Sequence, residues 1–107
     1  WPSPAMNGML GSCHALELCF VFGTIDSTQS RELCGAGPAC DALEETIQDS
    51  WLAFAKTGDP SNPKVGEWKP YGDTRETMIL GDPTGPASAP YETERLAWEG
   101  VTSVGTL

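Results

Sequence analysis

The residues best suited to chemistry lie within the first forty positions. His14 is the one histidine among the 107 residues, and histidine is the residue type that exchanges protons near neutral pH. Four cysteines accompany it, at Cys13, Cys19, Cys34 and Cys40. Acid–base chemistry would therefore depend on His14, and thiol or metal chemistry would depend on the cysteines.

The spacing of these residues argues against a zinc site. Structural zinc sites usually place their ligands in two pairs, two to four residues apart. Here Cys13 and His14 are adjacent, and five residues separate Cys34 from Cys40. We therefore expect no metal or other cofactor, and an independent metal-binding domain is the weakest functional alternative. Buried free thiols fit better, and Cys34 and Cys40 could also close a small disulfide loop, although the sequence does not determine the pairing.

Nucleophilic catalysis within the chain alone is not supported either. The Gly-x-Ser-x-Gly turn that carries the nucleophile of many serine hydrolases is absent. A thiol enzyme needs its histidine opposite the cysteine, and the adjacent side chains of Cys13 and His14 are badly placed for this. A single histidine is also more often a hydrogen-bonded structural residue than a catalyst, so both interpretations of His14 stay open at this level.

Composition excludes some partners. Fifteen acidic and six basic residues give a formal net charge of -9, which repels nucleic acid and anionic lipid. No apolar run approaches the roughly 20 residues that cross a bilayer, and residues 1–11 do not resemble a secretory signal. We therefore expect neither a nucleic-acid nor a membrane partner. The compartment stays open, with the cytoplasm slightly favoured.

Two early segments position His14. Two prolines and two glycines predict an irregular loop over residues 1–11. Residues 13–23 are ambiguous: the apolar alternation favours a strand, whereas Leu, Ala and Glu favour a short helix ended by Gly23. Burial of this segment is expected in either case.

The clearest element is a helix over residues 41–57. Asp41 is a suitable N-cap, and Gly58 and Pro60 follow the last turn. An apolar stripe at helical spacing, which we expect in the core, comprises Leu43, Ile47, Trp51, Phe54 and Ala55.

The remainder is mostly loop. Residues 59–72 form a long predicted loop pinned by Trp68 and Tyr71, residues 77–80 a strand, residues 85–90 a loop, and residues 91–98 a short helix. Loops this long are unusual in a compact domain, which predicts an incomplete fold.

Two motifs in order resemble those of one family. Residues 11–23, Gly-Ser-Cys-His-Ala-Leu-Glu-Leu-Cys-Phe-Val-Phe-Gly, resemble the histidine motif of type-B carboxylesterases and cholinesterases. Residues 49–60, a helix ending in Thr-Gly-Asp-Pro, and the Glu-Trp-Lys-Pro-Tyr of residues 67–71 resemble the family's next landmark. The strand ending in Met-Ile-Leu-Gly and the helix with Trp98 follow in the same order.

The resemblance implies an α/β-hydrolase fold. Residues 1–107 would be the C-terminal part of one carboxylesterase catalytic domain, with helices, one or two strands and an incomplete sheet when alone. His14 would be the catalytic base of a serine esterase acting on small-molecule esters, with the serine and the acid outside this chain. Glu17 matches a common family glutamate and is the candidate to support the histidine, a solvated carboxylate being the alternative.

The resemblance also sets the expected partners. The remainder of the esterase domain would complete the active site, so the isolated chain should be inactive and should self-associate through exposed apolar faces. Two stretches depart from the family: Cys19 stands where bacterial members often have proline, and residues 27–40 follow no family pattern. Side chains near the histidine help to shape the substrate pockets, so the resemblance does not predict the substrate preference. The functional alternative is a non-catalytic, cholinesterase-like binding module that keeps the histidine.

Overall fold

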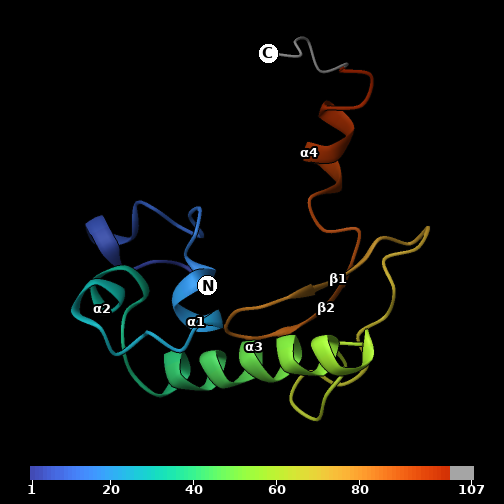
Figure 1. The fold of residues 1–107 in the computed structure, drawn as a ribbon. Coiled ribbons are helices and arrows are strands. Elements are labelled where there is room, and N and C mark those ends of the chain that lie inside the picture. Colours follow the sequence, from blue (N-terminus) through green and yellow to red (C-terminus); the bar gives the residue numbers. More distant parts are fainter. Residues whose placement is uncertain (102–107) are drawn as a thin grey trace, which may run out of the picture.

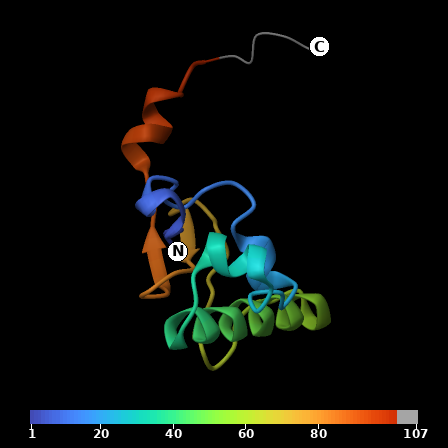
Figure 2. The ribbon, with the colours of Figure 1, turned by 90° about the vertical axis from the view of Figure 1, so that its left-hand side faces the viewer.

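The computed structural model describes residues 1–101. Several short helices and a two-stranded hairpin lie on one side of one long helix, α3, and the last helix extends away from the rest in both views (Figures 1 and 2). The elements in order are the 3-10 helix η1 (Ala5–Gly8), α1 (Glu17–Val21), α2 (Thr28–Cys34), α3 (Pro38–Thr57), β1 (Glu76–Ile79), β2 (Gly85–Ser88) and α4 (Glu92–Ala97).

Helix α3 is longer than predicted at its start. It begins at Pro38 with Gly37 as N-cap, so Asp41 lies in the first turn and the prediction that it caps the helix was wrong. Proline suits this start because its ring presets φ and it lacks an N–H that would have no partner there. The predicted end is confirmed: Gly58 has φ 79° and donates its N–H to the carbonyl of Phe54 at 2.8 Å.

The apolar stripe of α3 is buried over only half of its length. Leu43 and Ile47 lie in the core, where α1 packs against the first half of α3. Trp51 and Phe54 are each 57% exposed, and Ala55 is also exposed. The prediction that these three side chains are core residues was wrong for this chain, because α1 and α2 reach only the first half of the helix (Figure 1).

Residues 13–23 form a turn and a short helix. Helix α1 replaces the alternative of a strand, because Leu16 and Phe20 are four residues apart and share one helical face. Both are buried together with Cys19, whereas Leu18 and Phe22 are exposed. The expected burial is therefore confirmed for one face of the segment only.

Helix α2 was not predicted from the sequence. Ser27 is its N-cap, and its hydroxyl accepts the N–H of Ser30 at 3.1 Å. The helix closes one side of a core formed by eight buried side chains, which are Leu16, Cys19, Phe20, Ile25, Cys34, Cys40, Leu43 and Ile47. Trp1 packs edge-on against Phe20 with ring centroids 6.1 Å apart.

The C-terminal region is a hairpin and one helix. Strand β1 and helix α4 confirm the strand and helix predicted there. Strand β2 corrects the predicted loop over residues 85–90, since it pairs antiparallel with β1 from Glu76 opposite Ser88 to Ile79 opposite Gly85. The loop prediction missed β2 because short-range sequence signals do not reveal that this segment pairs with β1. Residues 59–72 stay largely irregular, with Trp68 half-buried and Tyr71 exposed.

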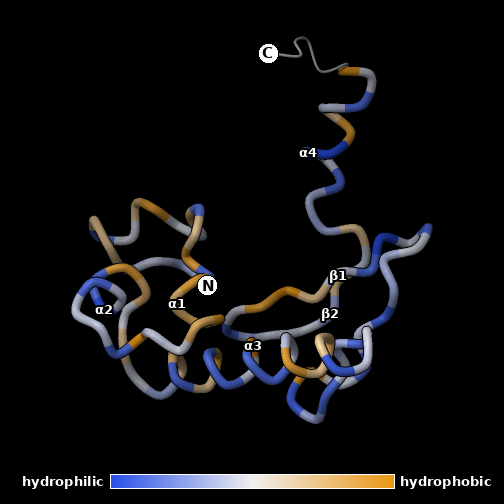
Figure 3. Tube along the Cα trace, in the orientation of Figure 1, coloured by the Kyte–Doolittle hydropathy of each residue, from blue (hydrophilic) through white to orange (hydrophobic). Residues whose placement is uncertain are grey.

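Apolar residues are not confined to the interior. Along the chain they are concentrated around α1, on parts of α3 and in β1, and others lie in α4, away from the core (Figure 3). No helix among residues 1–101 is long and apolar enough to span a bilayer.

Candidate functional site

His14 lies in a turn directly before α1. Its side chain is exposed, and within residues 1–101 it takes part in no hydrogen bond or ion pair. The alternative of a hydrogen-bonded structural histidine therefore finds no support in this structure. Both ring nitrogens are open to groups outside the described residues.

The backbone around His14 is held in place although the imidazole is free. We call residues 11–16 the histidine loop. At its start, the N–H of Ser3 donates to the carbonyl of Gly11 at 2.9 Å, and the hydroxyl of Ser12 donates to the carbonyl of Trp1 at 3.1 Å. At its end, Leu16 is buried in the core. The loop is thus fixed on both sides of the histidine.

Glu17 is the first residue of α1, and its side chain is exposed. No hydrogen bond joins it to His14 among the described residues, so its supporting role stays a prediction. Glu17 and Cys13 both line a small cavity of about 200 Å³ beside the histidine loop. The other lining residues are Trp1, Ser12, Leu16, Phe20, Leu43, Ile47 and Leu80.

The cysteines do not form the small disulfide loop between Cys34 and Cys40 that the sequence allowed. Cys19 of α1 and Cys34 of α2 form a disulfide, so Cys34 does not pair with Cys40. Cys40 is a buried free thiol and Cys13 a half-buried one. Burial raises the pKa of the Cys40 thiol, and the nearby carboxylates of Asp41 and Glu44 raise this pKa further.

These positions bear on the zinc alternative. Two of the four cysteines are joined to each other, and residues 1–101 contain no group of three or more side chains that could hold a metal ion. A disulfide sulfur has no thiolate to offer a metal. The Cys19 and Cys34 disulfide instead joins α1 to α2 next to the histidine loop.

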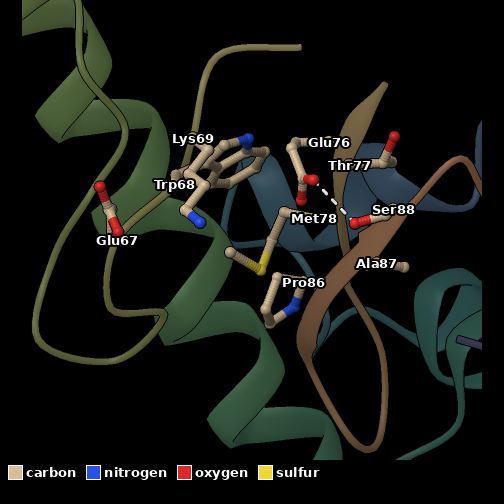
Figure 4. Close-up of a pocket in the computed structure, with 9 residues that line it drawn as sticks. All are labelled: Glu67, Trp68, Lys69, Glu76, Thr77, Met78, Pro86, Ala87 and Ser88. Atoms are coloured by element: carbon tan, nitrogen blue, oxygen red, sulfur yellow. Dashed lines mark hydrogen bonds between the residues drawn. The ribbon is translucent and has the colours of Figure 1, made fainter. Parts of the chain in front are cut away.

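A second pocket, of about 260 Å³, lies between the hairpin and the loop after α3 (Figure 4). The hydroxyl of Ser88 donates to the carboxylate of Glu76 at 2.7 Å, and Trp68 and Met78 supply apolar walls. The pocket has no histidine or cysteine among its lining residues. Its serine is bonded to a carboxylate and has no histidine beside it, so we place no serine–histidine chemistry there.

The arrangement around His14 can accept and return a proton, but it is incomplete as a catalytic site. Within the described residues no carboxylate orients the imidazole and no hydroxyl lies in hydrogen-bond contact with it. Sequence reasoning did not predict the contacts of Trp1 and Ser3, nor the Cys19 and Cys34 disulfide. No local signal reveals them, because the partners are brought together only by the packing of α1, α2 and the opening segment.

The chain resembles known esterases in sequence. No family model matches it. Para-nitrobenzyl esterase of Bacillus subtilis (strain 168) is 46% identical over 68 residues, which are 63% of this chain and 14% of that protein. This identity extends across most of the chain, and the relative is several times longer.

Solved esterase structures share the fold of the chain. A PNB esterase structure superposes with a TM-score of 0.71 at 39% identity, over 80% of this chain and 18% of the esterase. A carboxylesterase of Geobacillus stearothermophilus superposes with a TM-score of 0.71 at 29% identity, over 84% of this chain and 19% of the enzyme. The chain spans less than a fifth of the length of these relatives.

These likenesses confirm the fold class that the two motifs indicated. The helices and the two antiparallel strands match a segment of the larger esterase fold, and the two strands are an incomplete sheet by comparison. The chain is thus homologous to a segment of the type-B carboxylesterases, which are α/β-hydrolases.

Proposed function

We propose that this chain is the C-terminal part of a serine carboxylesterase and contributes the catalytic histidine, His14. The observation that carries the proposal is the 46% identity with an esterase, combined with a His14 that is exposed, has no hydrogen-bond partner within residues 1–101 and lies on a loop whose backbone is anchored. The nucleophilic serine and the acid would come from residues outside this chain. The substrate class is a small carboxylic ester.

In the proposed reaction His14 acts as general base and then as general acid. The serine hydroxyl attacks the ester carbonyl while His14 accepts its proton, and the tetrahedral intermediate collapses as His14 returns the proton to the leaving alcohol. Water then attacks the acyl-enzyme, with His14 again accepting the proton, and the serine is regenerated. An acid outside the chain would accept a hydrogen bond from the second ring nitrogen of His14 and so orient the imidazole.

Glu17 is proposed to support the site electrostatically. It stands three residues after His14, at the first turn of α1, and lines the cavity beside the histidine loop. Its carboxylate would stabilise the imidazolium that forms when His14 accepts the serine proton. We therefore expect Glu17 to contribute less than His14 itself.

The remainder of the esterase domain is the proposed partner of the exposed aromatic surface on α3. We call Trp51, Phe54 and Trp68 the tryptophan face; together with Ser50, Pro60 and Leu80 they line a mostly apolar cavity of about 440 Å³. Large exposed apolar patches usually mark interaction sites. In the isolated chain the same face is expected to drive self-association.

The test is fluorophosphonate labelling and ester hydrolysis of the parent protein that contains this sequence. We expect the label on a serine outside residues 1–107. The His14→Gln variant should lose at least roughly 10³-fold in kcat, since the base acts in the transition state. Glu17→Gln should lose less, and Glu45→Gln, an exposed carboxylate on α3, serves as the matched control with unchanged kcat.

Two results would count against the proposal. A parent that hydrolyses esters equally well with His14→Gln would remove His14 from the mechanism. A parent that neither hydrolyses esters nor takes up the label would favour a non-catalytic binding module with the same fold. The 107-residue chain alone should be inactive in either case, because it carries no nucleophile elbow.

A further inference from the structure

The C-terminal end of α2 is bonded to both sides of the histidine loop. On the side before the loop, the hydroxyl of Ser3 donates to the carbonyl of Leu33 at 2.5 Å, and the indole N–H of Trp1 donates to the carbonyl of Cys34 at 2.7 Å. On the side after the loop, Cys34 forms the disulfide with Cys19 of α1. Leu33 and Cys34 thus hold Trp1 and Ser3, which are bonded to the start of the loop at Ser12 and Gly11, and Cys34 also holds the helix that follows the loop.

The disulfide and Ser3 are shielded from water, and the hydrogen bonds of Trp1 and Ser3 are partly buried. Cys34 is fully buried, Ser3 is 1% exposed and Cys19 is 7% exposed. The two carbonyls belong to the last turn of α2, where backbone acceptors have no partner within the helix. The side chains of Trp1 and Ser3 satisfy them, so the end of α2 is bonded in a specific geometry.

We propose that Leu33 and Cys34 form a clamp that positions His14, with the Cys19 and Cys34 disulfide as its covalent part. This inference rests on the proposed function, in which His14 is the general base. A base must come within hydrogen-bond reach of its proton, and a misplacement of about 1 Å can cost up to roughly 10²-fold in rate. Cys19 and Cys34 are therefore positioning residues, acting on catalysis through the histidine loop.

The third buried cysteine does not compete for the disulfide. Exchange requires a thiolate, and burial together with the carboxylates of Asp41 and Glu44 raises the pKa of Cys40. Its Sγ lies 3.8 Å from the carbonyl oxygen of Gly35, in the same core. Its Sγ also lies 3.9 Å from the carbonyl oxygen of Cys34. Cys40 is thus a matched control for the disulfide alone: a buried cysteine of the same core that is bonded to neither Cys19 nor Cys34 through sulfur.

The experiment uses the parent protein and compares Cys19→Ala, Cys34→Ala and the double variant with Cys40→Ala. We expect kcat to fall about tenfold in the first three, with KM changed by less than about twofold. The double variant should lose no more than either single variant, because all three break the same bond. Cys40→Ala should keep kcat within about twofold.

Chemical reduction of the Cys19 and Cys34 disulfide is a second way to break the covalent part of the clamp. Tris(2-carboxyethyl)phosphine is added while the parent is unfolded and is kept present during refolding, because the folded protein buries the disulfide. The phosphine delivers two electrons to the disulfide, which becomes two thiols, and the phosphine itself takes oxygen from water and becomes its oxide. The reduced parent should have the kcat of the variant that carries both Cys19→Ala and Cys34→Ala. Treating this double variant with the phosphine should leave its kcat unchanged. Trp1→Phe, which keeps the ring and loses the N–H donor, should lower kcat by a smaller factor.

A merely stabilising disulfide predicts a different pattern. In that case the cysteine variants would melt at lower temperature but keep the kcat of the parent when assayed well below melting, and this result would overturn the inference. Peptide mapping that finds Cys19 and Cys34 as free thiols in the active parent would also overturn it. A parent without esterase activity or label would instead overturn the proposed function, and the inference with it.

Discussion

The two halves of this chain differ in how they bury their apolar side chains. Up to Ser50, eight apolar residues form one cluster, and Phe20, Cys34 and Cys40 are at most 1% exposed. Between residues 51 and 101, Met78 is the only buried apolar residue. Large side chains there face solvent; examples are Trp51, Phe54, Tyr71, Tyr91 and Trp98.

The difference shows which half leaves its large apolar side chains uncovered within the described residues. Helices α1 and α2 and the first half of α3 cover one another, so this region supplies its own core. Exposed aromatic side chains lie on the second half of α3, at Tyr71 and at the two residues that flank α4, Tyr91 and Trp98. Burying such surface stabilises a fold by about 25 cal/mol per Å², which is why we propose that this surface packs against the remainder of an esterase domain.

The largest expected effect compares two phenylalanines. In the 107-residue chain, Phe20→Ala should lower the free energy of unfolding by about 3–5 kcal/mol, because it leaves a cavity in a closed core. Phe54→Ala, at a side chain that is 57% exposed, should cost less than about 1 kcal/mol. Urea unfolding followed by far-UV circular dichroism measures both. Equal losses would contradict the division into two regions.

Self-association tests the exposed region directly. The 107-residue chain should form dimers or larger species in light scattering at micromolar concentration, because the tryptophan face is uncovered. The double variant Trp51→Glu and Phe54→Glu should remain monomeric, since each charge would be costly to bury. Phe22→Glu, at an exposed position of the first region, is the control and should not change the assembly. A monomeric wild-type chain would contradict this prediction.

Helix α3 extends through both regions, and its C-terminal end depends on the left-handed backbone conformation of Gly58. Gly58 has φ 79°, and a Cβ at this position would meet no atom within 4 Å, so Gly58→Ala should cost about 1 kcal/mol through the backbone alone. Gly85→Ala, also in open space but without positive φ, is the matched control and should be close to neutral. Thermal unfolding of both variants measures the contrast, and a neutral Gly58→Ala would refute the backbone explanation.

The smallest effect concerns the attachment of α4. Glu92 accepts from Arg95 and pairs with Arg75 at 2.7 Å, and hydrogen bonding to Arg95, followed by the charges of both arginines, lowers the pKa of this carboxyl. A lowered pKa means that the stabilisation is present above the unfolded pKa and is lost as pH falls through the folded pKa. Screening by solvent keeps it small.

Backbone NMR shifts of α4 followed from neutral to acidic pH measure this step. The helix should detach from the hairpin as Glu92 is protonated, while the shifts of α1 and α2 stay unchanged. Glu92→Gln should remove the acidic step. A titration that moves both regions together would show that α4 is not attached independently.

The sequence by itself predicted the features that depend on nearby residues. Spacing and a terminal glycine gave the long helix and its end at Gly58, and the two motifs gave the fold class that the esterase structures confirm. The same local signals indicated the strand at residues 77–80 and the last helix. Capping, helical periodicity and chain order are encoded within a few residues, so a single sequence is sufficient for them.

Tertiary structure decided what depends on distant partners. Strand β2 exists because β1 lies beside it, and Trp51 is exposed because α1 and α2 cover only half of the apolar stripe of α3. The pairing of Cys19 with Cys34, and the contacts of Trp1 and Ser3 with the end of α2, arise where separate segments meet. Burial and cross-linking are properties of the packed arrangement, so they appear only when the segments are placed together in space.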